Sequence, residues 1–97
     1  MKHVVLLKFK NDASQEQIDQ AFDQILDLTE TVDGVEDYVC GANCSAEGLD
    51  KGFTHGLVMS FHDSAARDAY LGHPDHEKIK AMIMPLVEDV MVVDFEL

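Results

Sequence analysis

The chain has 97 residues, and its seven Lys and Arg face nineteen Asp and Glu, which gives a formal net charge of -12 at pH 7. A chain of this length forms one domain, so we expect residues 1–97 to be a single folded unit. The negative charge repels phosphate backbones and anionic lipids, which argues against nucleic acid or a membrane as a partner. No apolar run approaches the roughly 18 residues that span a bilayer, and no cleavable signal precedes the first strand, so we expect a cytoplasmic protein.

The first thirty residues predict a strand followed by an amphipathic helix. The run Val4–Phe9 is apolar except for Lys8, which is typical of a strand buried on both faces. Ser14, with Gln17 three residues later, predicts a capping box at the start of a helix. Apolar positions then recur at helical spacing and predict one buried stripe: Ile18, Ala21, Phe22, Ile25, Leu26, Thr29 and Val32.

Glycine and polar residues separate the next elements. Gly34 predicts the end of the helix, because glycine readily takes the left-handed conformation just past a last turn. Val35–Cys40 is expected to form a second strand, 41–52 a polar loop and Phe53–Phe61 a third strand. Alternation puts Val35, Asp37 and Val39 on one face of the second strand, with Tyr38 on the other.

A phenol and two imidazoles surround an enforced break between two helices. A helix starting at Asp63-Ser64 must end before Pro74, which lacks an N–H and pushes His73 out of the helical region. A second helix begins at Pro74, with His73 as its expected cap. The corner directs Tyr70 and His76 toward one space, where a weak acid and a base that titrates near neutrality suit proton transfer. A satisfied polar core fits the pair equally well.

The end of the chain completes a recognisable order of elements. Ile79, Met82 and Ile83 continue an apolar stripe until Pro85, and Val90–Phe95 predicts a last strand. The resulting βαββαβ order is typical of an α+β, ferredoxin-like antiparallel sheet with its helices on one face.

The two halves of this arrangement echo each other. His3 precedes Phe9 by six positions and His55 precedes Phe61 by six, so the two histidines are expected on equivalent strands, pointing the same way. We expect Tyr70, His76 and both of these histidines to meet in one chamber. Val4, Leu6 and Val58 fall on the opposite face, which has no cover within one subunit. An exposed apolar face usually marks an interface, so we expect a homodimer in which two sheets close an α/β barrel.

Five segments, taken in order, resemble the stress-responsive dimeric α/β barrel (Dabb) family over nearly the whole chain: Lys2–Lys10, Gly34-Val35, Thr54-His55, Tyr70–His76 and Val93–Phe95. Resemblance to a plant polyketide cyclase of this family implies that His76 is a general base and Tyr70 its hydrogen-bonded partner, while His3 and His55 line the substrate site. The cyclase has a pocket tyrosine on its first helix, and the corresponding residue here is Ile25. The loss of that polar contact argues against the same substrate.

The resemblance also implies one weak metal site. Some relatives hold Mg²⁺ on main-chain carbonyls at the end of the first helix, which correspond to Thr29, Val32 and Val35 here. Carbonyls at a helix end are unsatisfied and carry the negative end of its dipole. An adventitious ion fits them equally well, and no other cofactor is expected.

Two functions remain open from the sequence. The first is a homodimeric Dabb domain whose small apolar cavity binds a small apolar or carbonyl-containing molecule without assured catalysis. The alternative is a cofactor-independent lyase, cyclase or isomerase that removes a proton next to a carbonyl. A cofactorless monooxygenase has less support, because nothing in the chain singles out an oxygen-activating group. The sequence is compatible with an enzyme and with a non-catalytic binding protein.

Overall fold

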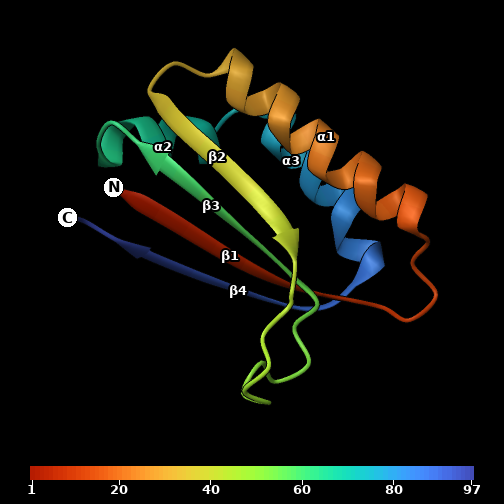
Figure 1. Cartoon of the computed structure of the whole chain (residues 1–97). Coiled ribbons are helices and arrows are strands. Elements are labelled where there is room, and N and C mark those ends of the chain that lie inside the picture. Colours follow the sequence, from red (N-terminus) through yellow and green to blue (C-terminus); the bar gives the residue numbers. More distant parts are fainter.

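In the computed structural model, which describes all 97 residues, four antiparallel strands form a sheet with the helices on one face (Figure 1). The elements are β1 (Lys2–Phe9), α1 (Gln15–Thr31), β2 (Val35–Ala42), β3 (His55–Phe61), α2 (Ser64–Leu71), α3 (Pro74–Ile83), a 3-10 turn (Met84–Leu86) and β4 (Val87–Phe95). The strand order is β2-β3-β1-β4, so β1 and β3 are central and β2 and β4 are the edges. The predicted ferredoxin-like α+β fold is confirmed.

Local signals in the sequence set where the helices begin. Ser14 and Gln17 form the expected capping box at the start of α1. The Asp63 side chain accepts a hydrogen bond from the backbone N–H of Ala66 and so caps α2. At α3, Nδ1 of His73 accepts from the N–H of Asp75 at 3.1 Å, which confirms His73 as the cap. None of the helices is both long enough and apolar enough to cross a membrane.

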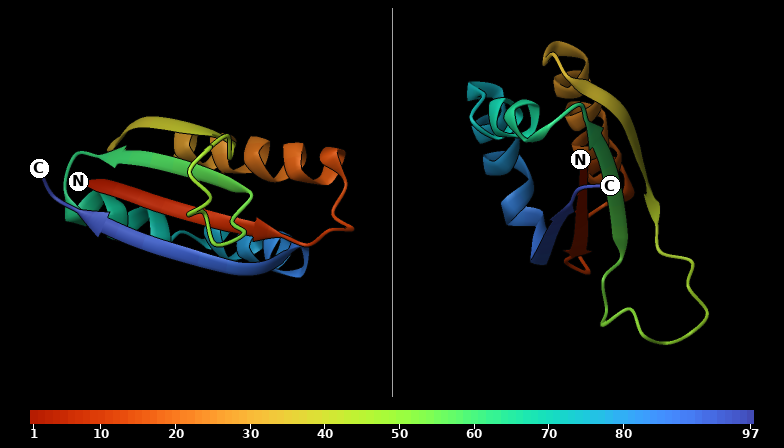
Figure 2. Two further views of the ribbon diagram at one scale, coloured as in Figure 1. Left: turned by 60° about the horizontal axis from the view of Figure 1, so that its bottom comes forward. Right: turned by 90° about the vertical axis from the view of Figure 1, so that its left-hand side faces the viewer.

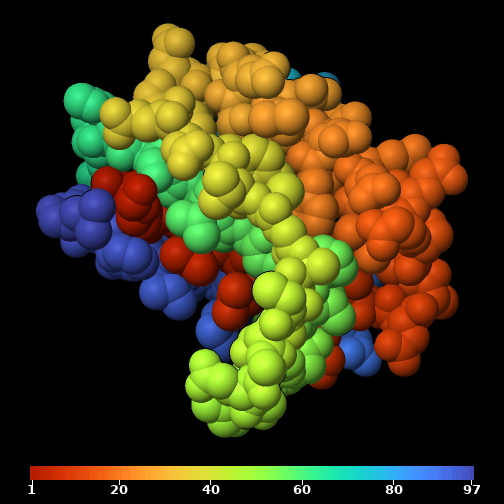
Figure 3. Space-filling view, viewed as in Figure 1, coloured from red at the N-terminus to blue at the C-terminus, as the bar shows by residue number.

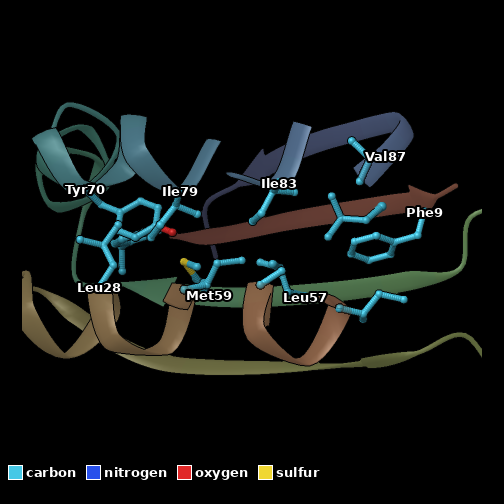
Figure 4. Packing of buried hydrophobic residues seen from close by; sticks show 13 residues of the cluster. Phe9, Leu28, Leu57, Met59, Tyr70, Ile79, Ile83 and Val87 are labelled. Carbon is cyan, nitrogen blue, oxygen red and sulfur yellow. The ribbon is translucent and has the colours of Figure 1, made fainter. Parts of the chain in front are cut away.

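The hydrophobic core fills the space between the sheet and the helices (Figure 4). It contains Leu7, Phe9, Ile18, Ala21, Ile25, Leu28, Leu57, Met59, Phe61, Tyr70, Ile79, Ile83 and Val87. The stripe predicted for α1 was wrong at one position, because Leu26 is 42% exposed and Leu28 is buried in its place. The 3.6-residue period leaves the edge of a helical stripe loosely specified, and contact with α3 determines which leucine is buried.

The strands differ from their predicted bounds and faces in ways that matter for the site. β4 begins at Val87, three residues before its predicted start at Val90. β3 begins at His55, two residues after its predicted start at Phe53. A register shift lies between Val35 and Asp37. Val35 and Tyr38 therefore both pack on the helix side, although simple alternation put them on opposite faces, because a bulge adds one residue to the alternation.

The second face of the sheet is uncovered within the subunit (Figure 2). A row of four valines crosses all four strands on it, since Val39 pairs with Val58, Val58 with Val4 and Val4 with Val93. Val39 and Val93 are 56% and 51% exposed. In Figure 3 residues of β1, in red, are visible between β3 and β4 on this face. The residues of β1 on this face are half-buried in a single subunit, and most of those on the helix side are buried.

The connection between β2 and β3 extends beyond the sheet, as the edge-on view in Figure 2 shows. Its residues Leu49 and Phe53 join Leu6 and Met91 of the sheet in lining an open hollow of about 650 Å³. Ten of the 16 residues that line this hollow are hydrophobic. The open apolar face predicted from the sequence thus exists, and the loop extends it at one end.

Candidate functional site

His3 brings an imidazole into the core at the start of β1. Its neighbours along the strand alternate between the two faces of the sheet, and His3 shares the helix side with the buried residues Leu7 and Phe9. The residue is only 5% exposed. Its ring lies edge-on to Phe61, with the ring centroids 5.9 Å apart, and edge-on to Tyr70 at 6.4 Å.

A chain of charged hydrogen bonds connects His3 to β4 and α2. Asp94 lies directly across from His3 in the β1–β4 ladder. Nδ1 of His3 is 2.6 Å from Oδ1 of Asp94, and Nη1 of Arg67 donates to the other oxygen, Oδ2, at 3.0 Å. The three side chains are between 6% and 23% exposed, so the ion pair is largely shielded from water. Arg67 comes from α2 and therefore joins that short helix to the edge of the sheet.

The break between α2 and α3 places Tyr70 against His76. α2 ends at Gly72, and α3 restarts at Pro74 with His76 in its first turn. The Tyr70 and His76 rings lie edge-on with their centroids 5.1 Å apart. Tyr70 is 3% exposed and also contacts Phe61. His3, Tyr70 and His76 thus form one cluster, which we call the His3 end of the core.

The surroundings of this cluster tune its two weak acids in a complementary way. Burial raises the pKa of the Tyr70 phenol to about 12, so it remains a hydrogen-bond donor at neutral pH. Burial lowers the pKa of His76, and the neighbouring Lys80 and His3 lower it further, whereas Glu77 has an opposing effect. A neutral imidazole beside a protonated phenol gives one proton acceptor and one hydrogen-bond donor.

Polar atoms of this cluster have no partners in the chain. Nδ1 of His76 is fully buried and makes no hydrogen bond. The Tyr70 hydroxyl donates no hydrogen bond to His76, although the resemblance implied one, and the two rings meet edge-on. A buried polar atom without a partner costs about 1–3 kcal/mol and therefore requires an explanation. The most direct explanation is a ligand or a water molecule that supplies the missing hydrogen-bond partner.

His55 lies at the opposite end of the core, so the expected single chamber was wrong. In the β1–β3 ladder His55 pairs with Leu7, four residues along β1 from His3, which corresponds to about 13 Å at the rise of an antiparallel strand. Its ring contacts Phe9 at 5.0 Å and Phe22 at 5.7 Å between centroids. The two histidines do point to the same face, as predicted, but β1 and β3 are antiparallel and so place them at opposite ends.

Asp94 and Arg67 are the residues of this cluster that the sequence interpretation missed. The sequence interpretation names no acidic residue as part of the site, and it includes Asp94 only within the Val93–Phe95 segment. One signal was available: Asp94 is a charge inside a strand whose neighbours Val92, Val93 and Phe95 are apolar. Its pairing with His3 depends on the register between the first and last strands, which no local pattern specifies.

The predicted magnesium site lies in a separate hollow at the end of α1. Thr29, Val32 and Val35 line it together with acidic residues that include Glu30 and Asp33. The Thr29 carbonyl accepts no backbone N–H, because α1 ends with the N–H of Val32 bonded to Leu28. No three His, Cys, Asp or Glu side chains lie close enough together to hold a metal ion. The residues fit a weakly held hard cation on main-chain oxygens, and the site stays a prediction.

A model of the Stress responsive A/B Barrel Domain (Dabb) matches residues 1–97. The chain belongs to the Dabb family. The stress-response A/B barrel domain-containing protein HS1 of Arabidopsis thaliana is 27% identical over 96 residues, which cover 99% of this chain and 88% of that protein. The olivetolic acid cyclase of Cannabis sativa is 22% identical over 95 residues, covering 98% and 94% of the two chains.

Among solved structures, a dimeric ferredoxin-like protein of unknown function from Jannaschia sp. CCS1 superposes with a TM-score of 0.89 at 26% identity, over 99% of this chain and 97% of that one. The family resemblance drawn from the sequence is confirmed. Ile25, which stands where the resemblance put a pocket tyrosine of the cyclase, is 5% exposed within the core.

Proposed function

We propose that this Dabb domain is a homodimer that binds a small apolar molecule bearing a carbonyl group at the His3 end of its core. The observation that carries the binding site is the buried Nδ1 of His76, which has no partner among the apolar rings around it. The Tyr70 hydroxyl, kept protonated by burial, supplies a donor for the carbonyl oxygen.

The dimer is supported by the valine row across the open face and by the Jannaschia relative, which is described as dimeric. Two sheets facing each other would remove this row from water in both subunits. Val4→Glu places a charge in the middle of the row, and Leu26→Glu is its control on the exposed side of α1. In sedimentation velocity we expect the wild type and Leu26→Glu at about twice the chain mass of 10.8 kDa and Val4→Glu as a monomer. A wild-type monomer contradicts the dimer.

A pair of matched probes tests the ligand site. Acetophenone and ethylbenzene have similar size and shape, but only acetophenone has a carbonyl. In an NMR titration we expect saturable shifts of the Tyr70 and His76 ring signals with acetophenone and weaker binding of ethylbenzene, by about tenfold for one lost hydrogen bond. Equal affinity for the two probes, or shifts confined to the open face around Val58, contradicts the proposed site.

A second candidate function, proton abstraction next to the bound carbonyl, is favoured by the opposite tuning of His76 and Tyr70. In this reaction His76 takes a proton from the carbon beside the carbonyl, and the Tyr70 hydroxyl donates a hydrogen bond to the enolate oxygen that forms. The lowered pKa of His76 keeps it neutral and able to accept that proton at pH 7. Return of a proton from His76 to the same carbon restores the ketone, so no co-reactant is consumed.

Hydrogen–deuterium exchange measures this step directly. In D₂O the methyl protons of acetophenone are replaced by deuterium whenever the enolate forms, and proton NMR follows the loss of their signal. We expect exchange above the buffer rate with the wild type, a reduction of about 10²-fold or more in His76→Gln, and no change in the control His62→Gln, whose side chain is exposed. Acetophenone that binds without faster exchange would leave the binding function in place and exclude this reaction for it.

A further inference from the structure

We propose that Asp94, held in place by Arg67, sets which nitrogen of His3 carries the proton, and that His3 consequently accepts a hydrogen bond from a hydroxyl group of the ligand. Asp94 and Arg67 are positioning residues in this scheme. The inference rests on the proposed function for its ligand, which becomes a hydroxy ketone in place of a plain ketone.

For a neutral His3, the donors and acceptors in the chain allow only one arrangement. The Asp94 carboxylate can only accept hydrogen bonds, and the Arg67 guanidinium can only donate them. Oδ2 of Asp94 receives Nη1 of Arg67 at 3.0 Å, which leaves Oδ1 facing Nδ1 of His3 at 2.6 Å. The proton of a neutral His3 must therefore lie on Nδ1, and Nε2 carries a lone pair.

The ring of His3 is held in place by its neighbours, so the position of its proton determines what it can bind. Its side chain is 6% exposed, and Phe61 and Tyr70 contact it edge-on. Nε2 makes no hydrogen bond within the chain, so its lone pair is free to accept one. With Tyr70 donating to the carbonyl, His3 supplies the complementary acceptor for an O–H on the same molecule. A site built to pair an O–H discriminates against an analogue that lacks it.

Asp94→Asn inverts this arrangement without changing the shape of the side chain. Arg67 can only donate, so the amide oxygen of Asn must face it, and the NH₂ group must face His3. That NH₂ donates to Nδ1, which moves the proton of His3 to Nε2. Asp68→Asn is the matched control, because Asp68 also bonds Arg67, through Nε and Nη2, but has no contact with His3.

Side-chain ¹⁵N NMR distinguishes the two tautomers of His3 and needs neither a ligand nor activity. We expect the Nδ1–H form in the wild type and in Asp68→Asn, and the Nε2–H form in Asp94→Asn. In the double variant Asp94→Asn with Arg67→Met, the amide is free to turn, and we expect a mixture. A wild-type His3 with a proton on Nε2, either as the Nε2–H tautomer or as the imidazolium, overturns the proposal whether or not the variants fold. An unchanged tautomer in folded Asp94→Asn does so as well. A pure Nε2–H form in the double variant overturns the role of Arg67.

Binding of 3′- and 4′-hydroxyacetophenone, compared with acetophenone, tests the ligand. We expect at least one isomer to bind about tenfold more tightly than acetophenone to the wild type, and this preference to disappear in Asp94→Asn, where Nε2 carries a hydrogen. No preference in the wild type overturns the hydroxyl assignment, while the tautomer result stands separately. Failure of all three compounds to bind, with the expected tautomers observed, instead contradicts the proposed binding function.

Discussion

The two ends of the core carry equivalent histidines in different surroundings. His3 bonds the carboxylate of Asp94 and contacts Tyr70, whereas Nδ1 of His55 lies 2.9 Å from the hydroxyl of Thr54, and its ring packs against phenylalanines. Figure 4 shows Tyr70 at one end of the cluster and Phe9 at the other. The repeated half-fold therefore supplies two strand positions of the same kind, and the element covering each one determines its chemistry.

The elements that pack over the two histidines explain why their surroundings differ. The His3 end lies beneath the α2–α3 corner, whose break brings Tyr70 and His76 together with the cation of Arg67. The His55 end lies beside α1, which contributes the apolar ring of Phe22. Four experiments, in order of decreasing expected effect, test whether the two ends differ as described.

Gly34→Ala is expected to have the largest effect on stability, because it disturbs the packing of α2 over the His3 end. Gly34 has a φ of +90°, and an added Cβ would lie 2.6 Å from the Cβ of Ala66 in α2. We expect a loss of about 3 kcal/mol in unfolding free energy, from left-handed strain together with overpacking. Gly48→Ala is the control, since its φ is +72° but nothing lies within 4 Å. Urea denaturation that gives equal losses for the two variants would show that the contact with Ala66 is unimportant.

Asp94→Ala is expected to destabilise the protein more than the corresponding change at the other end. It leaves Arg67 and His3 without their shared acceptor, and we expect a loss of about 2–3 kcal/mol, as for hydrogen bonds to charged groups. Thr54→Val removes a hydroxyl that accepts from the N–H of Phe9, donates to the Leu7 carbonyl and lies beside Nδ1 of His55. These hydrogen bonds join uncharged groups, and their loss should cost about 1–2 kcal/mol. The same denaturation experiment compares them, and a larger loss in Thr54→Val would reverse the ranking of the two ends.

Tyr70→Phe is expected to weaken acetophenone binding by about tenfold, the value of one lost hydrogen bond, while changing stability by less than about 0.5 kcal/mol. The stability should hardly change because the Tyr70 hydroxyl has no partner in the chain. His55→Gln, at the other end, should leave the affinity within about twofold of the wild type. Calorimetric titration measures both affinities. Similar weakening by both substitutions would mean that the ligand spans the whole core.

The smallest expected effect is a change in the pH dependence of stability. Burial lowers the pKa of His76 below its ordinary value of 6.5, so below that pH the unfolded chain binds a proton that the folded chain resists. The unfolding free energy should therefore fall as the pH drops from 7 to 5, and less steeply in His76→Gln. Burial lowers the pKa of His55 as well, so His55→Gln should act in the same direction. His62→Gln, at an exposed position, serves as the reference. A wild-type slope in His76→Gln would contradict the burial of its imidazole.

The sequence alone determined the order of the elements, the caps at Ser14 and Asp63, the corner at Pro74 and the apolar face that contains Val4 and Val58. Each of these follows from short-range chemistry or from a repeating pattern, which a single segment carries in full. The predicted fold and family were therefore confirmed by the strand order and by the match over residues 1–97.

Only the tertiary structure decided which side chains meet. Asp94 reaches His3 because the first and last strands pair in one particular register, and Arg67 reaches Asp94 because α2 packs over that edge. His55 is separated from His3 because the two central strands run antiparallel. These contacts join residues up to 91 positions apart, and their geometry depends on the packing of the whole domain, which local propensity does not encode.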